Sequence, residues 1–148
     1  MPGSKFERMN RIKAVEREHV AMRFAAEHLL GIVRHNPVAL KGAFRPQDLQ
    51  LASNRLEDTY FVRLFAEFEA SLRSYWRTYW ATAPPAHDLI ESVGARRKIP
   101  CDQVADAHRV REWRNAIVHD CDDRVEKISI GSARHYLCHY LAFLPQEW

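Results

Sequence analysis

Apolar residues recur every three or four positions along most of this chain, which is the spacing of one face of an α-helix. The first such segment runs from about Phe6 to Arg34. Pro37 follows it and disfavours the helical conformation for the residue before it. We therefore predict a first long helix that ends at His35-Asn36. The residues with this spacing are Ile12, Val15, His19 or Val20, Phe24, Leu29 or Leu30, and Val33.

The same spacing predicts three further long helices and one short one. Ser129 is a plausible N-cap for the last of them, because its hydroxyl can accept from a free backbone N–H. Gly94 is expected to end the short helix. The predicted helices cover Asp58–Trp80, Ala86–Val93, Cys101–Val118 and Ile130–Leu144.

The connections between these helices are polar or contain helix breakers. Residues 36–57 contain Pro37, Gly42 and Pro46 and are interpreted as a long loop, with one helical turn near Gln47–Leu51. Residues 96–98 are expected to form a basic turn, and residues 121–127 a charged loop. The pattern predicts an all-α fold, an antiparallel bundle of four long helices with an additional short helix.

Composition narrows the class of protein. A chain of 148 residues that is 47% hydrophobic and 28% charged is one ordinary globular domain, so we assign residues 1–148 to a single domain. The net charge of +3 is too small to indicate a nucleic-acid partner by itself. Three cysteines without close pairing indicate a reducing compartment. The absence of an apolar leader and of a long apolar run indicates a cytoplasmic protein with no membrane contact.

One stretch carries a chemically suggestive pattern. Near the end of the third long predicted helix, Arg114 is followed directly by Asn115 and, five positions after the Arg, by His119. The interval alone means little, because Arg23/His28 and Arg134/His139 repeat it. Only Arg114 and His119 stand at the end of a predicted helix, next to a charged loop where polar side chains can meet solvent and substrate.

This Arg-Asn-x-x-x-His pattern resembles the active-site signature of the HEPN domain family. The likeness covers about residues 58–144 and includes Phe65–Trp76, His108–Asn115 and Ile128–Ile130. It implies a helical bundle that works as a homodimer and cleaves RNA, plausibly as a toxin or antiviral defence effector controlled by an antitoxin protein. One departure is Cys121, where a toxin subfamily carries a tyrosine that is nucleotidylated, so that form of control is not expected here.

The residue types fit RNA cleavage without a metal or other cofactor. His119 can transfer protons near neutral pH, Arg114 can stabilise the charge that develops on the phosphoryl group, and Asn115 can orient either of them. Attack by the 2′-OH would leave 2′,3′-cyclic phosphate and 5′-OH ends. On a straight helix Arg114 and His119 lie about 140° apart, although the long Arg114 stem could reach round to the His edge. The resemblance implies that a homodimer brings two such sets into one cleft.

Four further residues are candidates for binding RNA or supporting the site: Arg111, Glu69, Arg73 and Arg97. Arg111 shares a polar stripe with His108, Asn115 and His119. Residues 73–80 interleave basic and aromatic side chains, as an RNA-stacking surface does. We favour the interpretation that their aromatic residues, including Tyr79, continue the core, with Arg73 and Arg77 facing solvent.

Two other functions stay open. A catalytically silent HEPN-like module would use the same polar face to bind a nucleotide or a protein. A metal-binding bundle would use His135, Cys138 and His139, because histidines four positions apart can share a metal. The apolar residues around that trio favour a packed helix with partly buried histidines, so no metal is expected.

Overall fold

A computed structural model describes residues 3–119 and 124–148 and confirms the all-α class. Within these ranges there are five α-helices and one short 3-10 helix, η1, and no β-strand. The elements are α1 (Lys5–His35), η1 (Pro37–Leu40), α2 (Pro46–Trp76), α3 (Ala86–Arg97), α4 (Cys101–Val118) and α5 (Ile130–Ala142). None of the described helices is both long and apolar enough to span a membrane.

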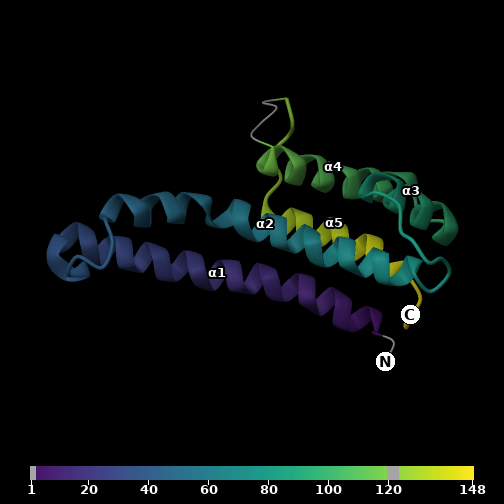
Figure 1. Cartoon of the computed structure of the whole chain (residues 1–148), viewed down its shortest axis with the longest axis horizontal. Coiled ribbons are helices and arrows are strands. Elements are labelled where there is room, and N and C mark those ends of the chain that lie inside the picture. The colour runs from purple at the N-terminus through teal and green to yellow at the C-terminus, as the bar shows by residue number, and fades with distance from the viewer. Residues whose placement is uncertain (1–2, 120–123) are drawn as a thin grey trace.

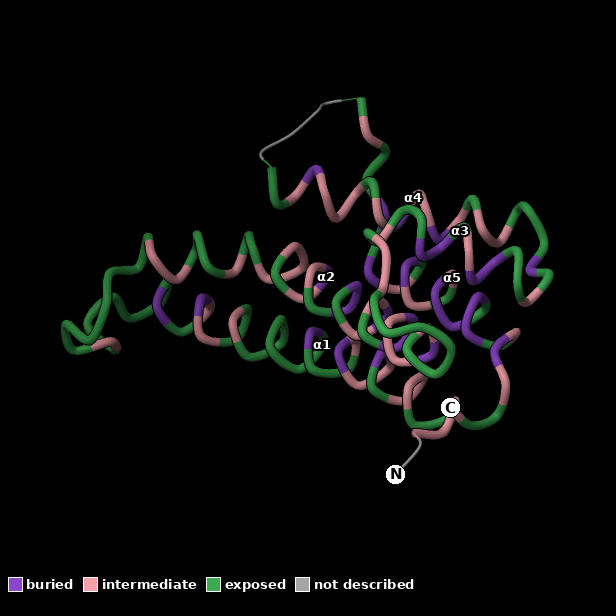
Figure 2. The backbone as a smooth tube through the Cα atoms, turned by 45° about the vertical axis from the view of Figure 1, so that its right-hand side comes forward, coloured by how far each residue is buried: buried purple, intermediate pink, exposed green. Residues whose placement is uncertain are grey.

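The helix α2 is the centre of the fold. It runs antiparallel to α1, and it also packs against α3, α4 and α5 (Figure 1). Its inward face carries seven buried residues in register: Phe61, Leu64, Phe65, Phe68, Ser71, Leu72 and Tyr75. The body of the bundle is therefore built around the second half of α2, and the core lies there (Figure 2).

The prediction of a long loop at 36–57 was wrong. The chain turns through η1, and α2 begins at Pro46, twelve residues before the predicted start at Asp58. Pro46 stands in the first turn of α2, where its missing N–H costs no hydrogen bond. At the same end, the Arg45 guanidinium donates a hydrogen bond to the Asp48 carboxylate. This first part of α2 packs on the distal half of α1 to form an arm that is mostly exposed (Figure 2). Because the first part of α2 buries few side chains, its sequence lacks the apolar spacing of three to four residues from which a helix is predicted.

Two other helix ends also differ from prediction. The helix α2 ends at Trp76 rather than Trp80, because the chain turns there: Thr78 donates its N–H and its hydroxyl to the Tyr75 carbonyl. The helix α3 continues through Gly94 and ends at Arg97, with Lys98 in the left-handed conformation at φ 53°. Residues 96 and 97 are thus the last helical turn, not a loop. The bounds of α1 and α4, and the Ser129 cap of α5, are as predicted.

Gly94 is required for close packing rather than for chain termination. A Cβ at this position would lie 3.0 Å from Cγ2 of Val104 in α4, whereas a Cβ at Gly31 in α1 would meet nothing within 4 Å. Near Gly94, the buried Tyr140 donates a hydrogen bond of 2.6 Å to the carbonyl of Ile90, and burial raises the pKa of its phenol. The glycine lets α3, α4 and α5 meet at this point.

We predict that alanine substitutions at the two glycines change the free energy of unfolding differently. We expect Gly31→Ala to raise the free energy of unfolding by about 0.5–1 kcal/mol, because alanine is the better helix former and the site is open. Gly94→Ala is expected to gain less or to lose stability, because the new methyl group pushes on Val104. Urea unfolding of both variants measures the difference. An equal gain at the two positions would contradict the close contact at Gly94.

Candidate functional site

The helix α4 presents the candidate catalytic residues. Ala107 and Val110 are buried and fix its inward face. The stripe formed by His108, Arg111, Glu112, Asn115 and His119 is therefore turned away from the core, in agreement with the sequence pattern, and each of these residues is at least partly exposed. The stripe runs along α4 to its end, where His119 is the C-cap.

Arg114 is held beside the bundle rather than extended into solvent. Its Nη1 donates a hydrogen bond of 2.9 Å to Oδ1 of Asn115, and its guanidinium carbon lies 5.7 Å from the centre of the Phe65 ring of α2. Its Nε is buried and has no hydrogen-bond partner among the residues that the structure describes. A guanidinium over an aromatic face is attracted to it, but an unpaired buried N–H costs free energy. Arg114 is therefore positioned with hydrogen-bonding capacity left over.

His119 is exposed at the end of α4. Its backbone N–H donates to the Asn115 carbonyl at 2.9 Å, and its φ of −103° marks the point where the helix stops. Asn115 thus contacts both candidates, Arg114 through its side chain and His119 through its backbone. The predicted neighbours Asp120 and Cys121 lie outside the described residues.

A surface pocket of about 620 Å³ lies between α3 and α4. His108 and Arg111 of the polar stripe line it, together with Lys98 at the end of α3. Neither Arg114 nor His119 belongs to its lining. The pocket therefore adjoins the amino-terminal part of the stripe, while the Arg-Asn-x-x-x-His residues lie at the other end.

The hydrogen bonds of His108 define its tautomer. Arg111 Nε can only donate, and it lies 3.3 Å from Nδ1 of His108, so this nitrogen accepts. The other nitrogen, Nε2, then carries the proton and donates to Oε1 of Glu91 at 2.7 Å. His108 is consequently held between α3 and α4 by contacts at both ring nitrogens, and Arg111 is engaged with it.

The remaining supporting candidates have contacts inside the fold. Arg73 binds Glu69 through Nε at 3.0 Å and Nη2 at 2.5 Å, and its Nη1 donates to the Pro84 carbonyl at 3.2 Å. Arg97 donates to the Phe143 carbonyl at 2.8 Å. The prediction that Arg73 faces solvent was wrong, since it is half-buried and ties α2 to the connection that follows; Arg77 is exposed as predicted.

The aromatic residues after α2 also differ from prediction. Tyr75 is fully buried, but Tyr79 is 49% exposed because the helix stops before it. The guanidinium carbon of Arg96 lies 3.8 Å from the centre of the Tyr79 ring and 5.2 Å from that of Trp80. A hydrogen bond with Arg96 lowers the pKa of the Tyr79 phenol. A stacked aromatic and arginine surface is therefore present where a core stripe was expected.

The metal site considered on α5 is not supported by the structure. His135 and His139 are exposed, contrary to the partial burial we predicted, and their ring centres lie 4.0 Å apart. Cys138 is buried in the core, and burial raises the pKa of its thiol, which disfavours the thiolate that binds metals. The trio therefore does not converge.

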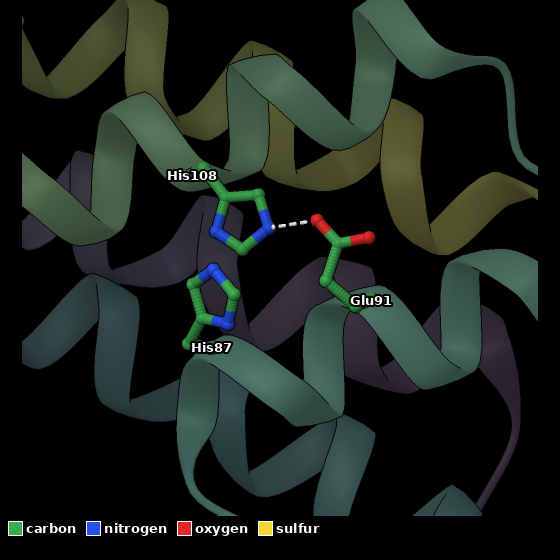
Figure 3. Close-up of side chains that lie close together, drawn as sticks. All are labelled: His87, Glu91 and His108. Atoms are coloured by element: carbon green, nitrogen blue, oxygen red, sulfur yellow. Dashed lines mark hydrogen bonds and ion pairs between the residues drawn. The ribbon is translucent and has the colours of Figure 1, made fainter.

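A different convergent group was missed by the sequence analysis. His87 and Glu91, four positions apart on α3, meet His108 of α4, and one donor atom from each lies within 4.8 Å of the others (Figure 3). The spacing of His87 and Glu91 on one helix face was visible in the sequence. Nothing in the sequence indicated that His108, seventeen residues later, would face them.

Comparison with known proteins gave no relative. No protein-family model matches the chain, and no match was found among curated proteins or solved structures. Membership of the HEPN family therefore stays a prediction that rests on Arg114, Asn115, His119 and their flanking residues.

Proposed function

We propose that this protein is a metal-independent endoribonuclease of the HEPN type, with Arg114, Asn115 and His119 at its reactive centre. The observation that carries the proposal is the arrangement at the end of α4. There, Asn115 holds the Arg114 guanidinium by a 2.9 Å hydrogen bond, and an exposed histidine follows one turn later at the helix end. An anchored cation beside an exposed proton-transfer group is what cleavage of a phosphodiester by its own 2′-OH needs.

In the proposed reaction, the 2′-oxygen attacks the adjacent phosphorus while a His119 imidazole accepts its proton. The bond from phosphorus to the 5′-oxygen breaks, and this oxygen takes a proton from a second acid. The products are a 2′,3′-cyclic phosphate and a 5′-OH, so no atom from water or a cofactor is consumed. A phosphate oxygen at Arg114 would complete the hydrogen bonds of its guanidinium and neutralise the charge that develops in the transition state.

Two copies of the chain fit this chemistry better than one. Arg114 leans towards Phe65 of α2, whereas His119 is exposed at the helix end, so the two groups diverge within one copy, and the reaction also needs a second group to act as the acid. A second His119, brought by a partner copy, would supply that acid. The proposal therefore includes a homodimer whose cleft contains both Arg-Asn-x-x-x-His segments.

The test uses purified protein in excess EDTA with a short single-stranded RNA. We expect cleavage that leaves 2′,3′-cyclic phosphate and 5′-OH ends, identified by mass spectrometry of the fragments. The matched control is the same oligonucleotide with 2′-deoxyribose at the cleaved position, which lacks the nucleophile and should stay intact. Cleavage of the deoxy substrate, or loss of activity in EDTA, would overturn the mechanism. Absence of cleavage on tRNA and mRNA alike would favour a silent binding module.

A further inference from the structure

His87, Glu91 and His108 converge from two helices beside an open pocket (Figure 3). We propose that they form a binding site for a divalent transition metal, with Zn²⁺ as the ion that fits best. This site lies apart from the proposed ribonuclease centre. Metal binding would be an additional function, since the proposed cleavage reaction uses no metal. It also replaces the metal site considered on α5.

The donor set has the composition of an open zinc site. Two imidazole nitrogens and one carboxylate oxygen are ligands that Zn²⁺ accepts, and three protein ligands leave a fourth position for water or substrate. Ligand atoms in a tetrahedral zinc site lie about 3.4 Å apart, given metal–ligand bonds of about 2.1 Å. Here one donor atom from each of the three side chains lies within 4.8 Å of the others, and the His108–Glu91 contact is 2.7 Å. Side-chain rotations alone can close this set around an ion.

His87 already has the outer contact of a metal-ligating histidine. Its Nδ1 lies 3.1 Å from Oδ1 of Asp88, so Nδ1–H donates to that carboxylate and leaves the lone pair of Nε2 free. Figure 3 shows one nitrogen of His87 facing the His108 ring, and the two ring centres are 4.7 Å apart. A histidine oriented by a carboxylate is the common second contact of zinc ligands.

His108 must change its tautomer when the metal binds. Its Nε2 now donates to Glu91, but a metal needs the lone pair of that nitrogen, so the proton moves to Nδ1. Nδ1 then faces the Arg111 Nε–H, which lies 3.3 Å away and is also a donor. The Arg111 side chain therefore has to move away from Nδ1 when the metal binds. Its positive charge also repels the metal cation. The structure thus contains one neighbour that favours the metal, Asp88, and one that disfavours it, Arg111.

The fourth position faces the pocket between α3 and α4. His87 and Glu91 have more than half of their side-chain surface exposed, and His108 only 14%. The ion would therefore be anchored at His108, the least exposed of the three ligands, and open to solvent on the other side. A site of this form binds an exchangeable ion and can place an oxygen ligand on it within the pocket.

Calorimetric titration of the metal-free protein with ZnCl₂ tests the proposal. We expect one equivalent to bind, and this binding to be abolished in the double variant His87→Ala/His108→Ala. The matched control is His135→Ala/His139→Ala, which removes another close pair of exposed histidines and should leave the stoichiometry unchanged. The background variant Cys101→Ser excludes a contribution of the exposed thiol. Loss of binding in the α5 variant, or retention in the α3/α4 variant, would overturn the assignment.

Two single variants separate a ligand site from a folding defect. We expect Asp88→Asn to weaken zinc binding about tenfold, because the carboxylate that orients His87 is lost. Arg111→Gln should strengthen binding several-fold, because a glutamine oxygen can accept from Nδ1–H of His108 and the opposing charge is removed. A general loss of structure would weaken both. Equal effects of the same sign would contradict the arrangement, and neither measurement depends on RNA cleavage.

Discussion

Replacing His119 by alanine is expected to lower the rate of RNA cleavage by about 10²–10⁴-fold, the range for loss of a general acid or base. The side chain is exposed at the C-cap of α4, so its removal should leave the fold intact. The rate is measured on a labelled RNA in EDTA under single-turnover conditions. Thermal unfolding of the variant, unchanged from the parent, shows that the loss is chemical.

Arg114→Ala should lower the rate by about 10²–10³-fold, because the guanidinium stabilises charge in the transition state. Mixing the Arg114 and His119 variants should restore part of the activity if two copies share one cleft. The control residues are Arg23 and His28, which have the same spacing on the exposed arm. Alanine at either should leave the rate unchanged.

These variants give a clear negative outcome. If His119→Ala cut RNA as fast as the parent protein, the reactive centre would not be at the end of α4. An equal loss in the Arg23 and His28 variants, with thermal unfolding unchanged, would show that the activity is not specific to the end of α4. Both outcomes would contradict the proposed function and would leave the zinc site untouched.

The second large effect is on stability. Phe68→Ala is expected to lower the free energy of unfolding by about 3–5 kcal/mol, the cost of removing a large buried side chain and leaving a cavity. Phe68 is fully buried, with its ring centre 5.8 Å from that of Phe65 and 5.4 Å from that of Tyr140. The unfolding midpoint should fall by roughly 6–20 °C for a chain of this length.

The matched control for this prediction is Phe24→Ala on the arm. Phe24 is 73% exposed, so its removal should change the free energy of unfolding by less than about 0.5 kcal/mol. Thermal and urea unfolding of both variants make the comparison. A similar loss at the two positions would mean that the arm is packed against something in solution, such as a second copy of the chain.

The all-α class and most of the helices could be predicted from the amino-acid sequence. Apolar spacing marked α1, the second half of α2, and α4 and α5, and within the body of the bundle these helices bury one face against the core. Local chemistry was also readable: Ser129 accepts from the Ser132 N–H as a cap, and the polar stripe of α4 faces outward. The Arg-Asn-x-x-x-His pattern was likewise visible, because its residues are close in the chain.

The three-dimensional structure was needed to show that a helix forms where the apolar spacing is absent and to show which distant residues meet. The first part of α2 was interpreted as a loop because a helix that buries little needs few apolar residues. Gly94 was read as a helix end because its close contact with Val104 depends on how α3 and α4 cross. The same crossing brings His108 to His87 and Glu91, and no local pattern encodes a contact between side chains on different helices.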